Sequence, residues 1–231
     1  MALDRKRPVP HMQRMTETRP KTALITGASR GLGFATAVEV ARRGFHVIAT
    51  ARTTGGLEDL ADQIAPIGGI PTLVPLDITD DAGLARMGRA IFDRWGKLDL
   101  LVHAAAHAPP CAPVAQTNAK DLDKSFSVNA RGTQQLIFMC DPLLSTAPRG
   151  QMIYVTDSRA GTCFFGAYGA SKAAGQAIVE SWAAEAVGVN VSLFAPHPMP
   201  TAARARFYPG EDRTKLTPIV DEARRLAAQI Q

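Results

Sequence analysis

Short apolar runs alternate with longer helical patterns along residues 21–231, and this alternation limits the possible folds more than any other feature. The apolar runs are rich in Val, Ile and Leu with little polar alternation, which is typical of parallel strands buried on both faces. The candidate strands are residues 21–26, 45–50, 71–76, 98–104, 151–156 and 189–194. The helical patterns fall near residues 31–43, 56–65, 80–95, 118–144, 166–187 and 217–230. The sequence therefore predicts an α/β fold with a single doubly wound parallel sheet of about six strands and helices on both faces.

The composition excludes several other classes of protein. Of the 231 residues, 46% are hydrophobic and 20% are charged, which excludes a disordered, collagen-like or coiled-coil chain. The longest uncharged run, residues 100–119, contains three prolines and cannot continue as a membrane-spanning helix. The three scattered cysteines form neither a disulfide framework nor a Cys-x-x-Cys site, so we expect no metal and a reducing, cytoplasmic compartment.

The net charge of +5 is concentrated at the N-terminus. Residues 1–21 contain six basic and two acidic residues, so the rest of the chain is nearly neutral and offers no basic face to nucleic acid. We interpret residues 1–20 as a basic, disordered tail, or as sequence upstream of a later start at Met12 or Met15. No apolar stretch follows these charges, which argues against a secretory signal.

A glycine-rich turn joins the first predicted strand to the first predicted helix. Glycines here let the backbone turn tightly and approach a ligand, and the following helix offers unpaired N–H groups to a pyrophosphate. The flanking strand and helix favour this interpretation over a turn that merely needs glycine. The predicted dinucleotide-binding residues of the turn are Gly27, Ser29, Arg30, Gly31, Leu32 and Gly33.

The second predicted strand ends in Ala51 and Arg52, where a fold that prefers NAD carries an acidic residue for the ribose 2′-hydroxyl. Arg52, together with Arg30 of the glycine-rich turn, instead favours a 2′-phosphate, because guanidinium groups bind phosphate through charge and paired hydrogen bonds. The alternative is that both arginines are solvated surface residues. We therefore expect NADP(H) as the cofactor.

Tyr168 and Lys172 lie four residues apart in a predicted helix and so share one helical face. A nearby ammonium group favours the phenolate, and it can bring a tyrosine with an ordinary pKa of about 10 into the range of proton transfer. Ser158 follows the fifth predicted strand, at the sheet edge where ligands bind. The Tyr-x-x-x-Lys spacing alone is weak evidence, because most such pairs are surface contacts.

Together these motifs resemble the short-chain dehydrogenase/reductase family over residues 21–201. The matching motifs are TGASRGLG at 26–33, Asp77-Ile78, SVNARG around Asn129, DSRAG around Ser158, YGASK at 168–172, and Thr201 after Pro196. The resemblance implies a Rossmann-like, NADP(H)-dependent oxidoreductase that transfers hydride between the nicotinamide and a carbonyl or alcohol substrate. The alternative is a cofactor-binding regulatory or scaffold protein that has lost turnover, since fold alone does not decide function.

The resemblance also assigns roles to residues. Tyr168 would be the general acid and base, Lys172 would lower its pKa and bind the nicotinamide ribose, and Ser158 would orient the substrate oxygen. Asn129 would hold a water in the proton relay. Asp77 and Ile78 would contact adenine, and Thr201 would contact the carboxamide end of the cofactor. The implied cofactor-binding set is completed by Ala104 and Ala105.

The chain departs from the family pattern in several places. The family's Asn-Asn-Ala-Gly is replaced at residues 103–106, so we expect altered cofactor binding, with His103 as a structural rather than a catalytic histidine. The family's Pro-Gly reads Pro196-His197, and histidine adopts left-handed backbone less easily than glycine. Residues 202–216 are expected to form a polar substrate loop. The family's last strand, with its Asp-Gly-Gly signature, is missing, which again predicts six strands.

The partners that the resemblance implies are a small-molecule carbonyl or alcohol, and further copies of this chain in a homodimer or homotetramer. We expect neither nucleic acid nor a membrane as a partner. Helical regions 118–144 and 173–187 could pair with those of a second copy. Apolar surface for this contact would come from Phe138, Met139, Ile178 and Trp182, unless they face the sheet instead.

Overall fold

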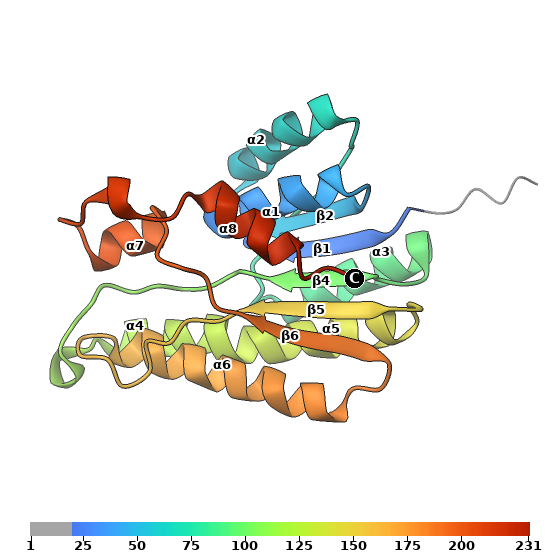
Figure 1. The fold of residues 1–231 in the computed structure, drawn as a ribbon. Coiled ribbons are helices and arrows are strands. Elements are labelled where there is room, and N and C mark those ends of the chain that lie inside the picture. Colours follow the sequence, from blue (N-terminus) through green and yellow to red (C-terminus); the bar gives the residue numbers. More distant parts are fainter. Residues whose placement is uncertain (1–19) are drawn as a thin grey trace, which may run out of the picture.

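In the computed structural model, which describes residues 20–231, one parallel sheet lies between two layers of helices (Figure 1). Within these residues the sheet has six strands in the order β3-β2-β1-β4-β5-β6. The strands are β1 (Thr22–Thr26), β2 (His46–Ala51), β3 (Thr72–Pro75), β4 (Leu100–His103), β5 (Gly150–Val155) and β6 (Val189–Phe194). This confirms the predicted doubly wound α/β fold. The expected basic tail, residues 1–20, lies outside the described residues except for Pro20.

Helices cover both faces of the sheet (Figure 1). The longer ones are α1 (Gly31–Arg42), α2 (Thr54–Ile64), α3 (Asp81–Trp95), α4 (Ala119–Phe126), α5 (Gly132–Ser145), α6 (Gly166–Glu185) and α8 (Ile219–Ala227). Ala23 and Ile25 of β1 pack in an apolar cluster with α1, α2 and α8, whereas Leu24 packs in a second cluster with α3, α5 and α6. Because neighbouring side chains point to opposite faces, the central residues of β1 must be apolar on both faces of the sheet. None of the helices in residues 20–231 combines the length and apolar character that a bilayer span needs.

All strands of the described sheet are paired in parallel, so their carboxyl ends meet at one edge. Thr26 at the end of β1 pairs with Thr50 of β2 on one side and with His103 of β4 on the other. Val155 at the end of β5 pairs with Phe194 of β6. The turns and segments that leave this edge carry most of the predicted site residues, as expected for a doubly wound sheet.

The helical stretch predicted over residues 118–144 is present as α4 and α5, with one departure from α-helical geometry between them. A π-helical turn, Ser127–Arg131, separates α4 from α5. Helix α6 approaches this turn so closely that a Cβ on Gly175 would lie 2.2 Å from the carbonyl oxygen of Asn129. That oxygen accepts a hydrogen bond from Thr133 Oγ1 at 2.8 Å. Side-chain periodicity does not reveal a single wide turn, and such turns are frequent at functional sites.

Residues 202–216, expected to be a loop, contain the short helix α7 (Ala202–Phe207) and a 3-10 turn, Arg213–Lys215. The hydroxyl of Thr201 caps α7 by accepting a hydrogen bond from the backbone N–H of Arg204 at 3.2 Å. Arg204 pairs with Glu211 at 2.5 Å and so folds the segment back on itself. The polar composition indicated a surface segment, but the cap and the ion pair give it helical structure.

Three of the four apolar residues expected at a contact between copies pack inside this chain. Met139 and Trp182 are buried in the cluster under α5 and α6, and Ile178 packs against it. Phe138 is 74% exposed on α5. The homodimer or homotetramer stays a prediction, and of these four side chains Phe138 is the one that a second copy could cover.

We expect Gly175→Ala to destabilise the fold. The new Cβ would lie 2.2 Å from the carbonyl oxygen of Asn129 and 2.7 Å from the hydroxyl oxygen of Tyr154, so α6 must move away from the π-helical turn. Overpacking of this kind lowers the free energy of unfolding by about 1–3 kcal/mol, which chemical denaturation measures. Gly55→Ala in α2 is the matched control, because a Cβ there meets nothing within 4 Å. Equal losses in the two variants would contradict the assigned contact.

Candidate active site

The turn between β1 and α1 brings the predicted dinucleotide-binding residues together. Gly27 and Gly31 have φ values of 68° and 60°, in the left-handed region that favours glycine. A Cβ on Gly33 would lie 2.4 Å from the carbonyl oxygen of Gly27, so the first turn of α1 packs directly on the loop. Arg30 at the N-cap makes no capping hydrogen bond with its side chain. The N–H groups and the positive dipole end of α1 therefore suit a bound anion.

A buried network of hydroxyl groups and His103 connects this turn to the end of β4. The Oγ1 atom of Thr26 accepts hydrogen bonds from the backbone N–H groups of Ala104 and Ala105, both at 3.2 Å. It also contacts Nδ1 of His103 at 2.7 Å, and Nε2 of His103 contacts Oγ1 of Thr133 at 3.0 Å. Burial, followed by the charge of Lys172, lowers the pKa of His103 to about 3. The ring is thus neutral with both nitrogens paired, an arrangement that supports the expected structural role of His103.

Tyr168 lies in the first turns of α6 and is 8% exposed. Its hydroxyl donates a hydrogen bond to Oδ2 of Asp157 at 3.0 Å. Burial, and then the charge and the hydrogen bond of Asp157, raise the pKa of Tyr168 above its ordinary value. We expected the ammonium group of Lys172 to lower this pKa. In the structure a carboxylate contacts the hydroxyl instead, and it acts in the opposite direction.

Lys172 is buried one turn further along α6, with its ammonium group directed at other partners. Nζ donates hydrogen bonds to the hydroxyl of Tyr154 at 3.0 Å and to the carbonyl oxygen of Val155 at 2.7 Å. Burial lowers the pKa of Lys172 to about 8, although the carboxylate of Asp157 opposes this shift. Lys172 is therefore close to the pH range in which it can exchange protons.

Within the described residues, no hydrogen bond joins the other two predicted catalytic residues to the Tyr168 hydroxyl. Ser158 is exposed, and within residues 20–231 no hydrogen bond joins it to Tyr168. Its neighbour Asp157 accepts the hydrogen bond from the Tyr168 hydroxyl instead. The sequence analysis missed this contact, although Asp157 belongs to the same motif after β5. Asn129 binds the backbone N–H and carbonyl of His107 at 2.7 and 2.9 Å and Oγ of Ser171 at 2.9 Å. It fixes the segment after β4 against α6.

The residues predicted to contact the adenosine half lie after β2 and β3. An Nη atom of the half-exposed Arg52 lies 3.8 Å from Oδ2 of Asp77. Asp77 also accepts hydrogen bonds from the N–H and the hydroxyl of Thr79, at 3.0 and 2.8 Å. Burial alone would raise the pKa of Asp77, but Thr79 and the charges of Lys124 and Arg52 hold it below its ordinary value. Ile78 is buried beside Asp77, and Arg30 is exposed in the neighbouring turn.

The segment after β6 reaches the glycine-rich turn. A Cβ on Gly31 would lie 3.6 Å from Cγ2 of Thr201, an ordinary van der Waals distance. The structure therefore places the predicted nicotinamide-binding residue Thr201 next to the predicted phosphate-binding turn.

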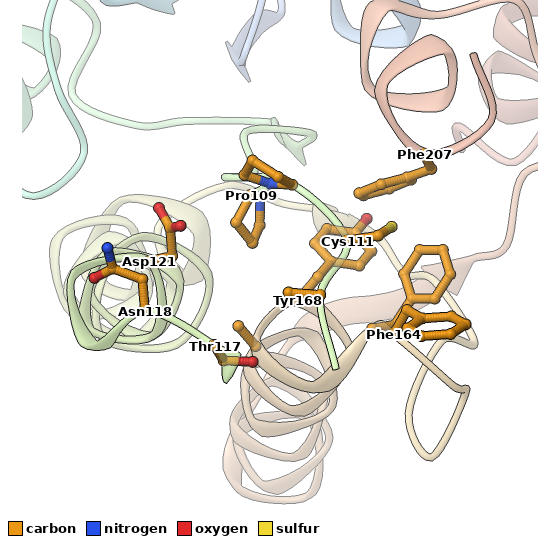
Figure 2. Close-up of a pocket in the computed structure, with 12 residues that line it drawn as sticks. Pro109, Cys111, Thr117, Asn118, Asp121, Phe164, Tyr168 and Phe207 are labelled. Atoms are coloured by element: carbon orange, nitrogen blue, oxygen red, sulfur yellow. The ribbon is translucent and has the colours of Figure 1, made fainter. Parts of the chain in front are cut away.

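A pocket lies beside Tyr168, between the segments after β4 and β5 and the helix α7 (Figure 2). The ring of Phe207 from α7 lies 5.0 Å from the ring of Tyr168 and 4.9 Å from that of Phe165. Phe164 has a φ of 68°, a strained conformation for an aromatic residue and one that accumulates at functional sites. Within residues 20–231, no group of three or more His, Cys, Asp or Glu side chains is arranged to hold a metal ion.

We expect Asp157→Asn to lower the pKa of Tyr168 while leaving it above the ordinary value, because the carboxylate raises this pKa but burial is the larger cause. The phenolate should therefore form at lower pH in the variant than in the wild type. Ultraviolet titration, with the signal of a Tyr168→Phe protein subtracted, measures the change. Asp121→Asn is the control, because Asp121 lines the same pocket without a hydrogen bond to Tyr168. An unchanged titration in Asp157→Asn would contradict the assigned contact.

Comparison with known proteins agrees with this geometry. Residues 21–212 match the model of the short chain dehydrogenases. FrzI, a short-chain dehydrogenase/reductase of Cladobotryum sp, is 35% identical over 78% of this chain and 71% of its own. Sorbitol dehydrogenase of Cereibacter sphaeroides is 34% identical over 76% of this chain and 69% of its own.

Solved structures show the same relationship. A short chain dehydrogenase from Shigella flexneri, crystallised with NADP, has a TM-score of 0.84 and 28% identity over 87% of each chain. One from Escherichia coli, crystallised with NADPH, has a TM-score of 0.83 and 28% identity over 87% of this chain and 86% of its own. The family match covers most of this chain and includes every motif quoted above. The chain belongs to the short-chain dehydrogenase/reductase family.

Proposed function

We propose that this protein is an NADP(H)-dependent oxidoreductase that interconverts a carbonyl and an alcohol, with Tyr168 as general acid and base. The observation that carries the proposal is the burial of Tyr168 and Lys172 on α6. They lie at the same edge of the sheet as the start of α1, which has no side-chain cap. Burying a hydroxyl and an ammonium group costs free energy, and perturbed groups of this kind cluster at catalytic sites.

The residues at the carboxyl edge fit a dinucleotide. The uncapped start of α1 suits the pyrophosphate, and the turn that carries Arg52 suits a 2′-phosphate on the adenosine ribose. The bound cofactor supplies or accepts the hydride. Relatives crystallised with NADP and NADPH support this choice. The proposed binding residues are Gly27, Ser29, Arg30, Gly31, Leu32, Gly33, Arg52, Asp77, Ile78, Ala104, Ala105, Tyr168, Lys172 and Thr201.

In the direction of reduction, Tyr168 gives its proton to the carbonyl oxygen of the substrate. Burial and Asp157 keep the hydroxyl protonated, so it is ready to act as an acid, and the substrate oxygen takes the place of Asp157 as its acceptor. Lys172 then favours the phenolate through its charge and helps to return the proton. Ser158 orients the substrate oxygen once its exposed side chain turns toward Tyr168.

Asn129 is proposed to hold a water in the proton relay. The π-helical turn that carries it supports this role, since such turns are frequent at functional sites. The amide of Asn129 joins His107 to Ser171, so it also keeps the segment after β4 in place beside Tyr168.

The pocket favours a small-molecule carbonyl or alcohol with an apolar body, because Pro109, Phe164, Phe165 and Phe207 line it together with Tyr168. The ring of Phe207 lies 5.0 Å from that of Tyr168, so α7 forms one wall of the pocket beside the hydroxyl. We also propose a reducing, cytoplasmic location, which the unpaired state of Cys111, Cys140 and Cys163 supports.

We expect NADPH oxidation with a panel of ketones, aldehydes and quinones to show turnover of at least one compound. Tyr168→Phe should lower kcat/KM at least about 100-fold, the usual contribution of a general acid. Its midpoint in chemical denaturation should be close to that of the wild type and so serves as the control for folding. Full activity in Tyr168→Phe would show that another group is the acid. Tight NADPH binding without turnover of any compound would favour the regulatory or scaffold protein.

We expect NADP(H) to bind at least about tenfold tighter than NAD(H), a difference of about 1.4 kcal/mol. A 2′-phosphate would meet the guanidinium groups of Arg52 and Arg30, whereas a hydroxyl offers them no charge. Arg52→Ala should remove most of this preference and barely change NAD(H) binding in calorimetric titrations. Arg42→Ala is the control, because Arg42 pairs with Glu39 at the other end of α1. Equal affinity of the wild type for both cofactors would exclude the assigned role of the two arginines.

A further inference from the structure

The chain between β6 and α7 is held by an unusual set of polar contacts. This segment, residues 195–201, ends in Thr201 and contains His197 where the family pattern has glycine. Phe164 is the single non-glycine residue of positive φ in residues 20–231, so His197 does not use the backbone freedom of glycine. A side-chain contact therefore fixes the backbone at this position instead of a glycine conformation.

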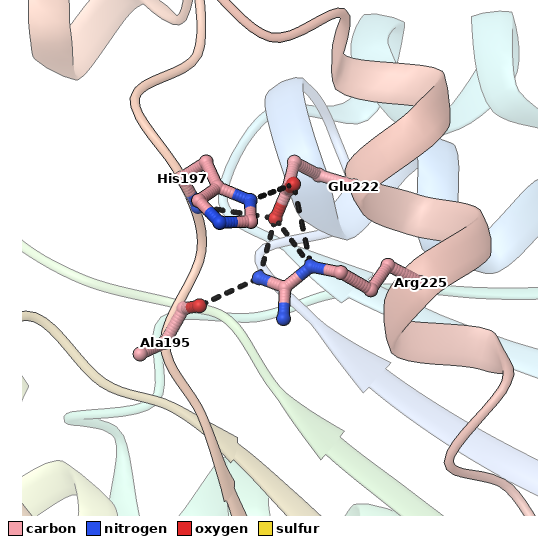
Figure 3. A network of polar contacts seen from close by, with 4 residues as sticks. All are labelled: Ala195, His197, Glu222 and Arg225. Carbon is pink, nitrogen blue, oxygen red and sulfur yellow. Dashed lines mark hydrogen bonds and ion pairs between the residues drawn. The ribbon is translucent and has the colours of Figure 1, made fainter.

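The contact is made by Glu222, which α8 presents to the segment (Figure 3). Its carboxylate is 2% exposed and accepts hydrogen bonds from the backbone N–H of His197 at 3.1 Å and from Nδ1 of the same residue at 2.7 Å. Arg225, one turn along α8, donates to the carboxylate at 2.7 Å and to the carbonyl oxygen of Ala195 at 2.6 Å. The guanidinium group also lies 4.2 Å from the ring centroid of Phe194, the last residue of β6.

Glu222 is ionised at neutral pH in this setting. Burial alone would raise its pKa, but the hydrogen bonds from Arg225 and His197 hold the pKa below the ordinary value. Removing one partner of a buried, hydrogen-bonded charge is much more disruptive than removing an exposed ion pair. The carboxylate is thus the centre on which His197 and Arg225 both depend.

These contacts join two parts of the site. On one side, α8 packs through Ala223 and Leu226 into the apolar cluster that contains Leu32 of α1. On the other, Glu222 and Arg225 hold the backbone of residues 195–197. The distance between the glycine-rich turn and the segment that carries Thr201 is therefore set through α8.

We infer that Glu222 is a positioning residue for the nicotinamide half of the cofactor, acting through His197 and Arg225 on the backbone of residues 195–201. The inference rests on the proposed function, because Thr201 is assigned to the carboxamide end of NADP(H). It differs from a role in general stability, because the adenosine half is assigned to residues after β1, β2 and β3, which Glu222 does not contact.

The test uses two ligands that share the adenosine half. NADPH contains the nicotinamide, whereas adenosine 2′,5′-bisphosphate lacks it. Glu222→Gln keeps the size of the side chain and removes its charge, and we expect it to weaken NADPH binding about tenfold or more and to change adenosine 2′,5′-bisphosphate binding less than about twofold. Asp221→Asn is the matched control, since Asp221 is the neighbouring exposed residue of α8 and pairs with Arg224. It should leave both affinities unchanged.

His197→Ala provides the second variant, because the side chain of His197 is 64% exposed and its loss does not endanger the fold. We expect the same selective loss of NADPH affinity in His197→Ala, together with faster amide hydrogen exchange across residues 195–201 in both variants. Unchanged NADPH affinity in a folded Glu222→Gln protein overturns the inference. If the Glu222→Gln protein does not fold, unchanged NADPH affinity in His197→Ala overturns it instead. Equal losses for the two ligands overturn it as well, because they indicate general loosening. A wild-type protein that binds neither ligand refutes the proposed function itself and the inference with it.

Discussion

The hydroxyl group of Thr26 ties together the two strands between which the site is built. It is fully buried at the end of β1, accepts hydrogen bonds from the N–H groups of Ala104 and Ala105, and contacts the ring of His103. Gly27 follows at once, and a Cβ there would lie 2.9 Å from the Cα of Ala105. The start of the glycine-rich turn is therefore fixed against the end of β4. Because the parallel strands share this edge, α1, the Tyr168 pocket and the segment after β6 are all positioned next to this fixed point.

Around this edge, three buried side chains with polar or ionisable groups are paired within the chain. The hydroxyl of Tyr168 binds Asp157, the ammonium group of Lys172 binds Tyr154, and Glu222 binds Arg225. An unpaired buried polar group costs about 1–3 kcal/mol, so these pairings stabilise the fold around the site. These pairings also determine which hydrogen bonds a substrate has to replace. When a substrate oxygen reaches Tyr168, it replaces the carboxylate of Asp157 as the acceptor of the hydroxyl hydrogen bond.

Local patterns in the sequence were sufficient for the fold and for the strand ends at which the predicted site residues lie, because these patterns depend on neighbours in the chain. The apolar run of β1 and the glycines after it specify a buried strand and a tight turn whatever surrounds them. The π-helical turn depends on the contact of Gly175 with Asn129, two residues far apart in the chain, so periodicity did not reveal it. Whether Asp157 or Ser158 contacts Tyr168 is decided by the conformation of the short connection after β5. The role of Glu222 requires the packing of α8, for which the sequence carries no motif.

The two histidines that replace family residues bear on whether the site is still functional. If the site had drifted after losing its activity, a buried imidazole in place of asparagine would be expected to leave unpaired polar atoms. Instead, both nitrogens of His103 are paired with hydroxyl groups, and the networks at His103 and His197 hold the backbone on either side of the glycine-rich turn. Each substitution is thus matched by polar partners that preserve the position of the segment it belongs to. This matching supports an enzyme that positions its cofactor by other contacts, rather than a fold whose cofactor site has decayed.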